Sequence, residues 1–215
     1  TGPYFQLKGT MFFWAHEYYL NRKHGYDTLS TSSGHRPLRA LMPIGFKRSF
    51  RDRVVKRFAP LLDTMYWSYA ERRLPDDVNF DRGLNPQWYK DTYASVVCET
   101  AVTGPLFLTE KSFKPIAYEH PFLLIAQPGA LDLLHKNGFV TYDNVFDESY
   151  DTEESFPERL NRVYNNVERI AETYHDRETV ERTTHNKQHF YNQQHVNSII
   201  QREVIYPLLE YAETR

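Results

Sequence analysis

The sequence predicts an α/β protein with a mostly parallel sheet that helices cover on both faces. Between residues 38 and 142, short apolar runs of strand length alternate with segments of helical spacing. This order is typical of parallel strands joined by crossover helices. The chain has 215 residues, of which 40% are hydrophobic and 15% aromatic, which is enough for one substantial core. No internal repeat and no low-complexity tract interrupts it.

The N-terminal part of the chain is rich in aromatic residues. Residues 4–24 combine them with apolar groups at mixed spacing, which indicates a helix with a strongly buried face. Glycine, serine, threonine and proline are frequent in residues 25–37 and predict a loop. Residues 38–44 form a short apolar run that ends at Gly45, as expected for a buried parallel strand.

The alternation continues through the middle of the chain. Residues 49–62 place apolar side chains at helical spacing. Residues 64–69 are β-branched and aromatic, which favours a second strand. Residues 71–92 are polar and contain proline and glycine, so they predict a loop with a short helix near 86–92. Residues 93–97 predict the third strand.

The second half of the chain predicts two more strands and several helices. Residues 109–120 are expected to be helical, 121–127 to form a strand, and 129–136 to form a helix stopped by an Asn-Gly pair. Residues 139–142 predict a final strand. From residue 154 to the C-terminus, apolar stripes at helical spacing predict further helices.

Composition excludes several classes of protein. The net charge of −2 indicates neither a nucleic-acid partner nor a membrane surface. Cys98 is the only cysteine, which rules out an intrachain disulfide and a cysteine-based metal site and fits a reducing, cytoplasmic compartment. No run reaches the roughly 18 apolar residues that span a bilayer. The chain opens without an initiator Met or a signal-peptide pattern, so we expect a processed or trimmed start.

Common catalytic motifs are also missing from the sequence. Neither a Walker phosphate loop nor Gly-x-Gly-x-x-Gly occurs, and there is no Gly-x-Ser-x-Gly elbow. No Asp-x-Asp triplet supports a metal-dependent transferase. His185 and His189 are four residues apart but lack the glutamate of a zinc protease, so we predict no metal site.

The clearest functional signal is the start of the helix predicted at residues 109–120. Thr109 is a good N-cap, and a capped helix start offers free amides and partial positive charge to phosphate oxygens. Lys111 and Lys114 add full charges beside it. Glu110 can accept hydrogen bonds from a ribose diol, and Phe107 can stack on a base. The alternative is ordinary helix capping, in which none of these residues contacts a ligand.

The run Phe107-Leu108-Thr109-Glu110-Lys111 resembles the donor-binding motif of fucosyltransferase-type GT-B glycosyltransferases. That motif is an aromatic and a hydrophobic residue followed by Thr-Glu-Lys at a helix start. The resemblance implies that Glu110 holds the ribose, that Lys111 contacts the pyrophosphate and that Phe107 lies beside the base. In the family, a strand with a small polar or acidic end precedes the motif, and Ser95 to Glu99 resemble that strand. The resemblance therefore implies that this strand borders the donor site.

The resemblance covers roughly residues 38–145, and the sequence departs from the family pattern at two places. Pro115 stands where the family usually has Asn, and it removes a helix hydrogen bond or moves the helix start towards Ser112. His120-Pro121 replaces an Ala-Gly turn. The run from Thr109 to Ile116 is also similar to uncharacterised proteins of bacteriophages and large viruses, which would place the protein in a host cytoplasm.

Basic residues gather between positions 36 and 57. Arg48 follows the first predicted strand, and the resemblance implies that an arginine at this turn clamps phosphate, for which a bidentate guanidinium is suited. The alternative is a solvated helix face from Arg48 to Arg57, and we expect that role for Arg51, Arg53 and Lys56.

Acidic residues at two places in the sequence are candidates for a functional role. Glu17, beside His16, is the candidate catalytic base, because a transferase base often comes from outside the nucleotide-binding half. The acidic residues of 147–151 either bind a cation or cap the following helix, and capping is the preferred interpretation.

These observations divide the chain into an N-terminal helical and loop segment (1–35), a Rossmann-like nucleotide-binding domain (36–150) and C-terminal helices packed on it (151–215). Such a domain corresponds to one GT-B-like half. The expected function is metal-independent transfer of a sugar from a nucleoside diphosphate sugar, without a cofactor, to a glycan, protein or modified DNA. The alternatives are a non-catalytic nucleotide-binding or interaction module and a phage glycosyltransferase that modifies DNA through the basic cluster.

Overall fold

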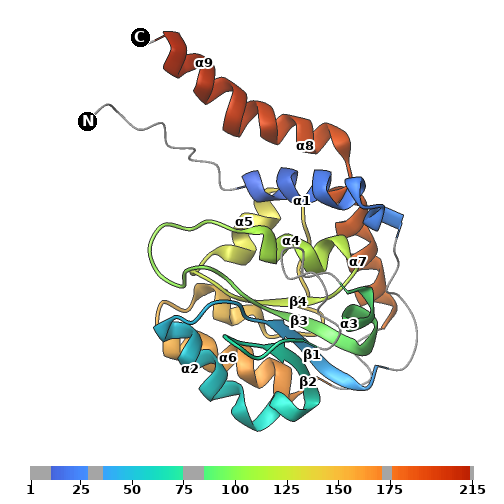
Figure 1. Ribbon diagram of the computed structural model, residues 1–215, viewed down its shortest axis with the longest axis vertical. Coiled ribbons are helices and arrows are strands. Elements are labelled where there is room, and N and C mark those ends of the chain that lie inside the picture. The colour runs from blue at the N-terminus through green and yellow to red at the C-terminus, as the bar shows by residue number, and fades with distance from the viewer. Residues whose placement is uncertain (1–10, 29–35, 75–84, 171–175, 214–215) are drawn as a thin grey trace.

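The computed structural model describes residues 11–28, 36–74, 85–170 and 176–213, and it confirms the α/β fold class (Figure 1). A four-stranded, wholly parallel sheet runs in the order β2-β1-β3-β4, as in Rossmann-like folds. The strands are β1 (Leu38–Pro43), β2 (Met65–Ser68), β3 (Thr92–Cys98) and β4 (Phe122–Ile125). Every residue of β3 and β4 is buried, because helices cover both faces of the sheet.

Parts of four predicted segments lie outside the described residues. They are residues 4–10 of the N-terminal helix, 29–35 of the first loop, 75–84 of the second loop, and 171–175 and 214–215 of the C-terminal helical part.

The prediction of a final strand at residues 139–142 is wrong. Its backbone groups bond to side chains instead of a neighbouring strand. The Val140 N–H donates to Asn186 Oδ1 and the Asn186 amide donates back to the Val140 carbonyl, both at 2.8 Å. The Tyr142 N–H donates to a Glu148 carboxylate oxygen at 2.6 Å. With these groups satisfied, the segment buries its aromatic side chains without joining the sheet.

One face of the sheet is covered by α2 (Ser49–Phe58) and α6 (Phe156–Glu168), which pack against each other (Figure 1). The rings of Phe58 and Tyr164 meet edge to face at 5.5 Å. The predicted helix at 49–62 changes at Phe58 into a 3-10 helix, η2 (Ala59–Thr64), which carries a proline in its first turn.

The opposite face is covered by α4 (Glu110–Ala117), over which α1 (Phe12–Lys23) packs (Figure 1). Trp14 of α1 stands at the centre of this layer, with its ring 4.6 Å from Phe139 and 6.4 Å from Phe113. The remaining helices of this part are α3 (Pro86–Asp91), α5 (Ala130–Lys136), the 3-10 helices η1 (Tyr26–Thr28) and η3 (Glu148–Thr152), and α7 (Arg177–Phe190).

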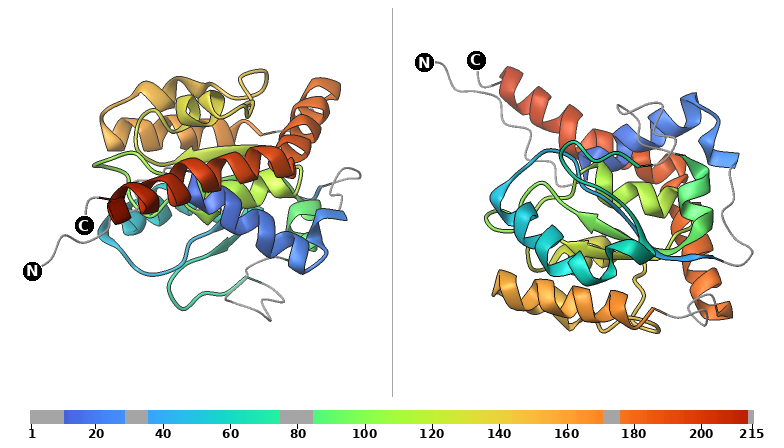
Figure 2. Two further views of the ribbon diagram at one scale, coloured as in Figure 1. Left: turned by 90° about the horizontal axis from the view of Figure 1, so that it is seen from above. Right: turned by 60° about the horizontal axis from the view of Figure 1, so that its bottom comes forward.

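The C-terminal helices form one continuous rod. It consists of α8 (Gln193–Ile200), a π-helical turn η5 (Gln201–Ile205) and α9 (Tyr206–Glu213). The α8 helix buries Val196 and Ile199 and contacts α1, whereas α9 buries none of its residues and extends beyond the body (Figure 2). Among the described residues, no helix combines the length and the apolar character that crossing a membrane would require.

Candidate functional site

A pocket of about 190 Å³ lies where the parallel strands end, between the sheet, α3 and α4. The last residues of β1, β2 and β3 (Pro43, Ser68 and Cys98) all line it, so it reaches the carboxyl edge where parallel α/β sheets bind ligands. The other lining residues are Gly45, Leu74, Trp88, Tyr89, Ser95, Val97, Glu110, Lys111, Lys114 and Pro115.

The start of α4 supplies the charged wall of the pocket. Thr109 is its N-cap, and its hydroxyl accepts from the Lys111 N–H at 3.4 Å, as the sequence predicts. The helix begins at Glu110 and keeps Pro115 in its interior. The Lys111 ammonium donates to Glu110 (2.8 Å), to the Thr109 hydroxyl (3.1 Å) and to Thr100 (3.3 Å).

Glu110 is therefore held as a carboxylate. Burial raises its pKa, but the hydrogen bond and charge of Lys111, with the charge of Lys114, outweigh burial and leave the pKa below its ordinary value. Lys114 makes no hydrogen bond or ion pair within the described part of the chain. The pocket thus presents one cation in a direct ion pair and a second, Lys114, whose charge acts on the nearby carboxylates of Glu110 and Glu17.

Glu99 holds the α4 start in place from behind the pocket. Its buried carboxylate accepts from the Thr109 N–H (3.0 Å) and hydroxyl (2.6 Å), from the Ser112 hydroxyl (2.7 Å) and from the Thr100 N–H (3.1 Å). All of its hydrogen-bonding capacity is used within the protein, and it does not line the pocket. Glu99 thus acts here as the anchor of the loop between β3 and α4.

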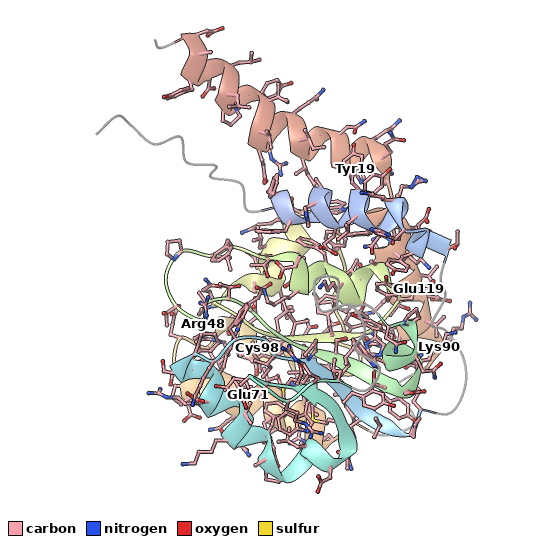
Figure 3. The ribbon with its side chains drawn as sticks, in the orientation of Figure 1. Tyr19, Arg48, Glu71, Lys90, Cys98 and Glu119 are labelled. Carbon is pink, nitrogen blue, oxygen red and sulfur yellow. The ribbon has the colours of Figure 1, made fainter. Side chains whose placement is uncertain are left out.

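Two arginines, one at the N-cap of α2 and one within it, bind the same loop. Arg48 is exposed and donates to the Thr100 carbonyl at 2.8 Å, outside the pocket but at the same end of the sheet as Cys98 (Figure 3). Arg51 donates to the carbonyls of Phe46 (3.0 Å) and Glu99 (3.3 Å). The prediction that Arg51 lies on a solvated face is wrong, because α2 turns it inwards, where it is buried; Arg53 and Lys56 are exposed as expected.

The aromatic wall of the pocket comes from residues that the sequence analysis did not select. Phe107 is half-buried in the loop before α4 and does not line the pocket. Trp88 and Tyr89 line it instead, from a short helix capped by Asn85, whose side chain accepts from the Gln87 N–H at 2.9 Å. The sequence signal that could have identified these two residues is the pair of adjacent aromatic side chains just after Pro86.

Cys98 reaches the pocket but is not a nucleophile. Burial raises the pKa of its thiol to about 12, so the sulfur stays protonated at neutral pH.

Glu17, the predicted base, is buried on α1 and does not line the pocket. One of its carboxylate oxygens lies 3.3 Å from His16 Nδ1, and the other has no partner. Burial raises its pKa, and the charges of Lys114 and His16 only partly offset this. A raised pKa suits a general base, but this carboxyl faces the contact of α1 with α4.

We expect Glu17→Gln to stabilise the protein by about 1 kcal/mol at pH 7, because it removes a buried, incompletely paired charge. The folded state binds the Glu17 proton more tightly than the unfolded state does. Wild-type stability therefore falls as pH rises from about 4.5 through the raised pKa, and the advantage of the variant shrinks as pH is lowered to 4.5. Urea unfolding at several pH values measures this, with exposed Glu158→Gln as the control. A variant less stable than wild type at pH 7 would mean that the carboxylate is well paired.

The acidic segment at 147–151 caps helices, but not the following helix as expected, because α6 begins after Ser155 without a side-chain cap. Asp147 accepts from the Ser149 N–H at 3.0 Å, and Asp151 accepts from the Leu131 N–H at 3.0 Å at the start of α5. Across the described ranges, no group of three or more histidine, cysteine or acidic side chains is placed to hold a metal ion.

Comparison of the chain with protein-family models, with curated proteins and with solved structures finds no match. Its function is therefore argued from the pocket.

Proposed function

We propose that the pocket binds a nucleoside diphosphate sugar and that the protein transfers the sugar to an acceptor hydroxyl without a metal ion. One observation carries the proposal. Glu110, Lys111 and Lys114, together with Ser95, meet in a single pocket at the carboxyl edge of a parallel sheet. Ser95 lies on β3 and the three charged residues lie on α4, and ordinary helix capping does not require them to share a cavity.

Each wall of the pocket suits one part of such a donor. The ammonium groups of Lys111 and Lys114 match the negative charge of a diphosphate, which grows as the sugar bond breaks. The Glu110 carboxylate only accepts hydrogen bonds, so it matches a ribose or sugar diol. The rings of Trp88 and Tyr89 offer an apolar surface to a base or a sugar face.

The size of the pocket limits how much of the donor it encloses. Small-molecule pockets usually measure about 300–1,000 Å³, and this one encloses about 190 Å³. It therefore holds the diphosphate with one neighbouring group, and the remainder of the donor lies at the pocket mouth. This is the division expected of one half of a two-domain GT-B enzyme, and we propose a fucosyltransferase-like relationship on that ground.

A DNA acceptor receives less support from the basic cluster. Four of its basic side chains are committed to the protein itself: Arg36 and Arg39 donate to backbone carbonyls, Arg51 is buried, and Arg57 lies 3.4 Å from the Tyr164 ring. Lys47, Arg48, Arg53 and Lys56 remain exposed.

A non-catalytic binding module is the other alternative. Release of product nucleotide from the sugar donor would distinguish a transferase from such a module.

The binding test is a thermal-shift panel of UDP, GDP, ADP, CDP, dTDP and their sugars. A ligand at about 100 times its Kd stabilises the folded state by about 2.7 kcal/mol, or roughly 5–10 °C in Tm at this chain length. We expect Lys111→Ala to weaken binding roughly 10–100-fold and to remove about half to four fifths of the shift, because a charge-assisted contact is lost.

Lys136→Ala is the matched control, since this lysine of α5 is 70% exposed and lies outside the pocket. Its shift should equal that of wild type. If no nucleotide changes the Tm of wild type, the proposal is wrong. If the full shift survives in Lys111→Ala, the nucleotide binds elsewhere.

A further inference from the structure

The floor of the pocket contains a serine bonded to a buried histidine. Ser95 Oγ lies 2.9 Å from His120 Nδ1, and His120, which precedes β4, has no exposed surface. The Ser95 backbone is taken up by β-pairing, with its N–H donating to the Pro121 carbonyl at 2.8 Å. Ser95 therefore presents its side chain to the pocket, as Val97 does two residues later on the same face of β3.

The tautomer of His120 follows from its other neighbours. Nε2 lies 2.7 Å from the Thr92 carbonyl oxygen, which can only accept a hydrogen bond. It also lies 3.4 Å from the Thr92 hydroxyl, whose own proton goes to the Trp88 carbonyl at 2.7 Å. Both neighbours act as acceptors, so Nε2 carries the proton and Nδ1 is a base. The Ser95 hydroxyl must then donate to Nδ1.

The histidine is also fixed in orientation. The ring of Tyr89 meets the His120 ring edge to face, with centroids 5.4 Å apart. Hydroxyl, base and orienting acceptor thus form a chain of three, which is the arrangement that activates serine hydroxyls in enzymes. A pair that only satisfies a buried histidine needs no exposure to a cavity, whereas Ser95 shares its pocket with Lys111 and Lys114.

We infer that Ser95 and His120 form a proton-relay pair that takes the proton of the acceptor hydroxyl; this role rests on the proposed sugar transfer. The acceptor hydroxyl gives its proton to Ser95 Oγ as the Ser95 proton moves to His120 Nδ1. The acceptor oxygen forms its bond to the anomeric carbon, and the bond from that carbon to the diphosphate breaks. The leaving diphosphate keeps the electron pair, opposite the two lysines. His120 ends as an imidazolium whose Nε2–H stays bonded to the Thr92 carbonyl, which also accepts from the buried Arg36 guanidinium at 2.6 Å.

The same proton path can be tested without a nucleotide. In the reaction with phenylmethylsulfonyl fluoride, Ser95 Oγ forms a bond to sulfur, fluoride leaves and the hydroxyl proton passes to His120. We expect one adduct on wild type by intact-mass measurement, mapped to Ser95 in a peptide digest. Ser95→Ala should abolish it. His120→Gln should slow it at least about 100-fold, which is the lower end of general-base effects.

Ser155→Ala is the matched control. Ser155 is exposed at the start of α6, lies outside the pocket and makes no side-chain capping hydrogen bond. This variant should label at the wild-type rate. Circular dichroism establishes that each variant is folded.

The pH profile of wild-type labelling tests the proton relay even if His120→Gln does not fold. A relay predicts a rate that rises with pH to a plateau, because only the neutral His120 imidazole can accept the Ser95 proton. A pH-independent rate, a wild type unlabelled at Ser95, or a folded His120→Gln that labels normally would overturn the inference. Because no nucleotide is added, that failure would leave the nucleotide-binding result unaffected.

Discussion

Glu99→Ala is expected to lower the free energy of unfolding by about 3–5 kcal/mol. The buried carboxylate accepts four hydrogen bonds, from Thr100, from both donors of Thr109 and from Ser112. Each buried donor left without a partner costs about 1–3 kcal/mol, and water entering the new space recovers part of that cost. Urea unfolding followed by far-UV circular dichroism measures the loss.

The substitution should also remove nucleotide binding. Glu99 fixes the loop that carries Thr109 and Lys111, so without it the α4 start loses its position relative to the strand ends. Glu110→Ala is the neighbouring stability control. Glu110 is part-exposed and pairs with Lys111, so its loss should cost no more than about 1 kcal/mol. A loss below 1 kcal/mol in Glu99→Ala would show that other contacts hold the loop.

The features that the sequence predicts well are those encoded by neighbouring residues. Each strand of the observed sheet was expected from an apolar or β-branched run, and the cap of α4 from Thr109 alone. Such signals are local, because strand pattern and capping depend on residues within a few positions. The carboxyl-edge position of the pocket then follows from the parallel order of the strands.

The errors concern contacts between distant parts of the chain. Residues 139–142 look like a strand, but Asn186, more than forty positions later, takes up their backbone groups. No local sequence pattern predicts that contact. Arg51 is a different case, since it shares a three- and four-residue spacing with the buried Val54 and Phe58. This spacing predicts burial, but the charge of the arginine side chain favoured the interpretation that it is solvated.

The candidate site shows the same division. Glu110, Lys111 and Lys114 lie within five positions at one helix start, so a short motif was enough to select them. Ser95 and His120 are twenty-five positions apart, and their meeting depends on the register in which Ser95 pairs with Phe122. Register between parallel strands is set by the whole packed sheet, and the sequence gives no direct access to it.

Trp14→Ala is expected to destabilise the protein by about 3–5 kcal/mol, the usual cost of truncating a large buried aromatic. The side chain is 2% exposed and contacts rings from three separate segments, those of Phe113, Phe139 and Phe190. Its indole N–H donates to the Phe190 carbonyl at 2.9 Å, and the substitution leaves that acceptor unpaired. Far-UV circular dichroism is the proper probe, because the substitution removes a fluorophore.

We expect the Trp14→Ala substitution also to disturb the pocket, because Trp14 packs against α4. Phe113 lies on α4 between Lys111 and Lys114, so a cavity at Trp14 removes the support behind the charged wall. Tyr19→Ala on the same helix is the matched control, since Tyr19 lies on the outer side of α1 and is 49% exposed (Figure 3). It should change stability by less than about 1 kcal/mol. Equal losses in the two variants would mean that the contribution of α1 comes from helix formation rather than from the packing of Trp14 onto α4.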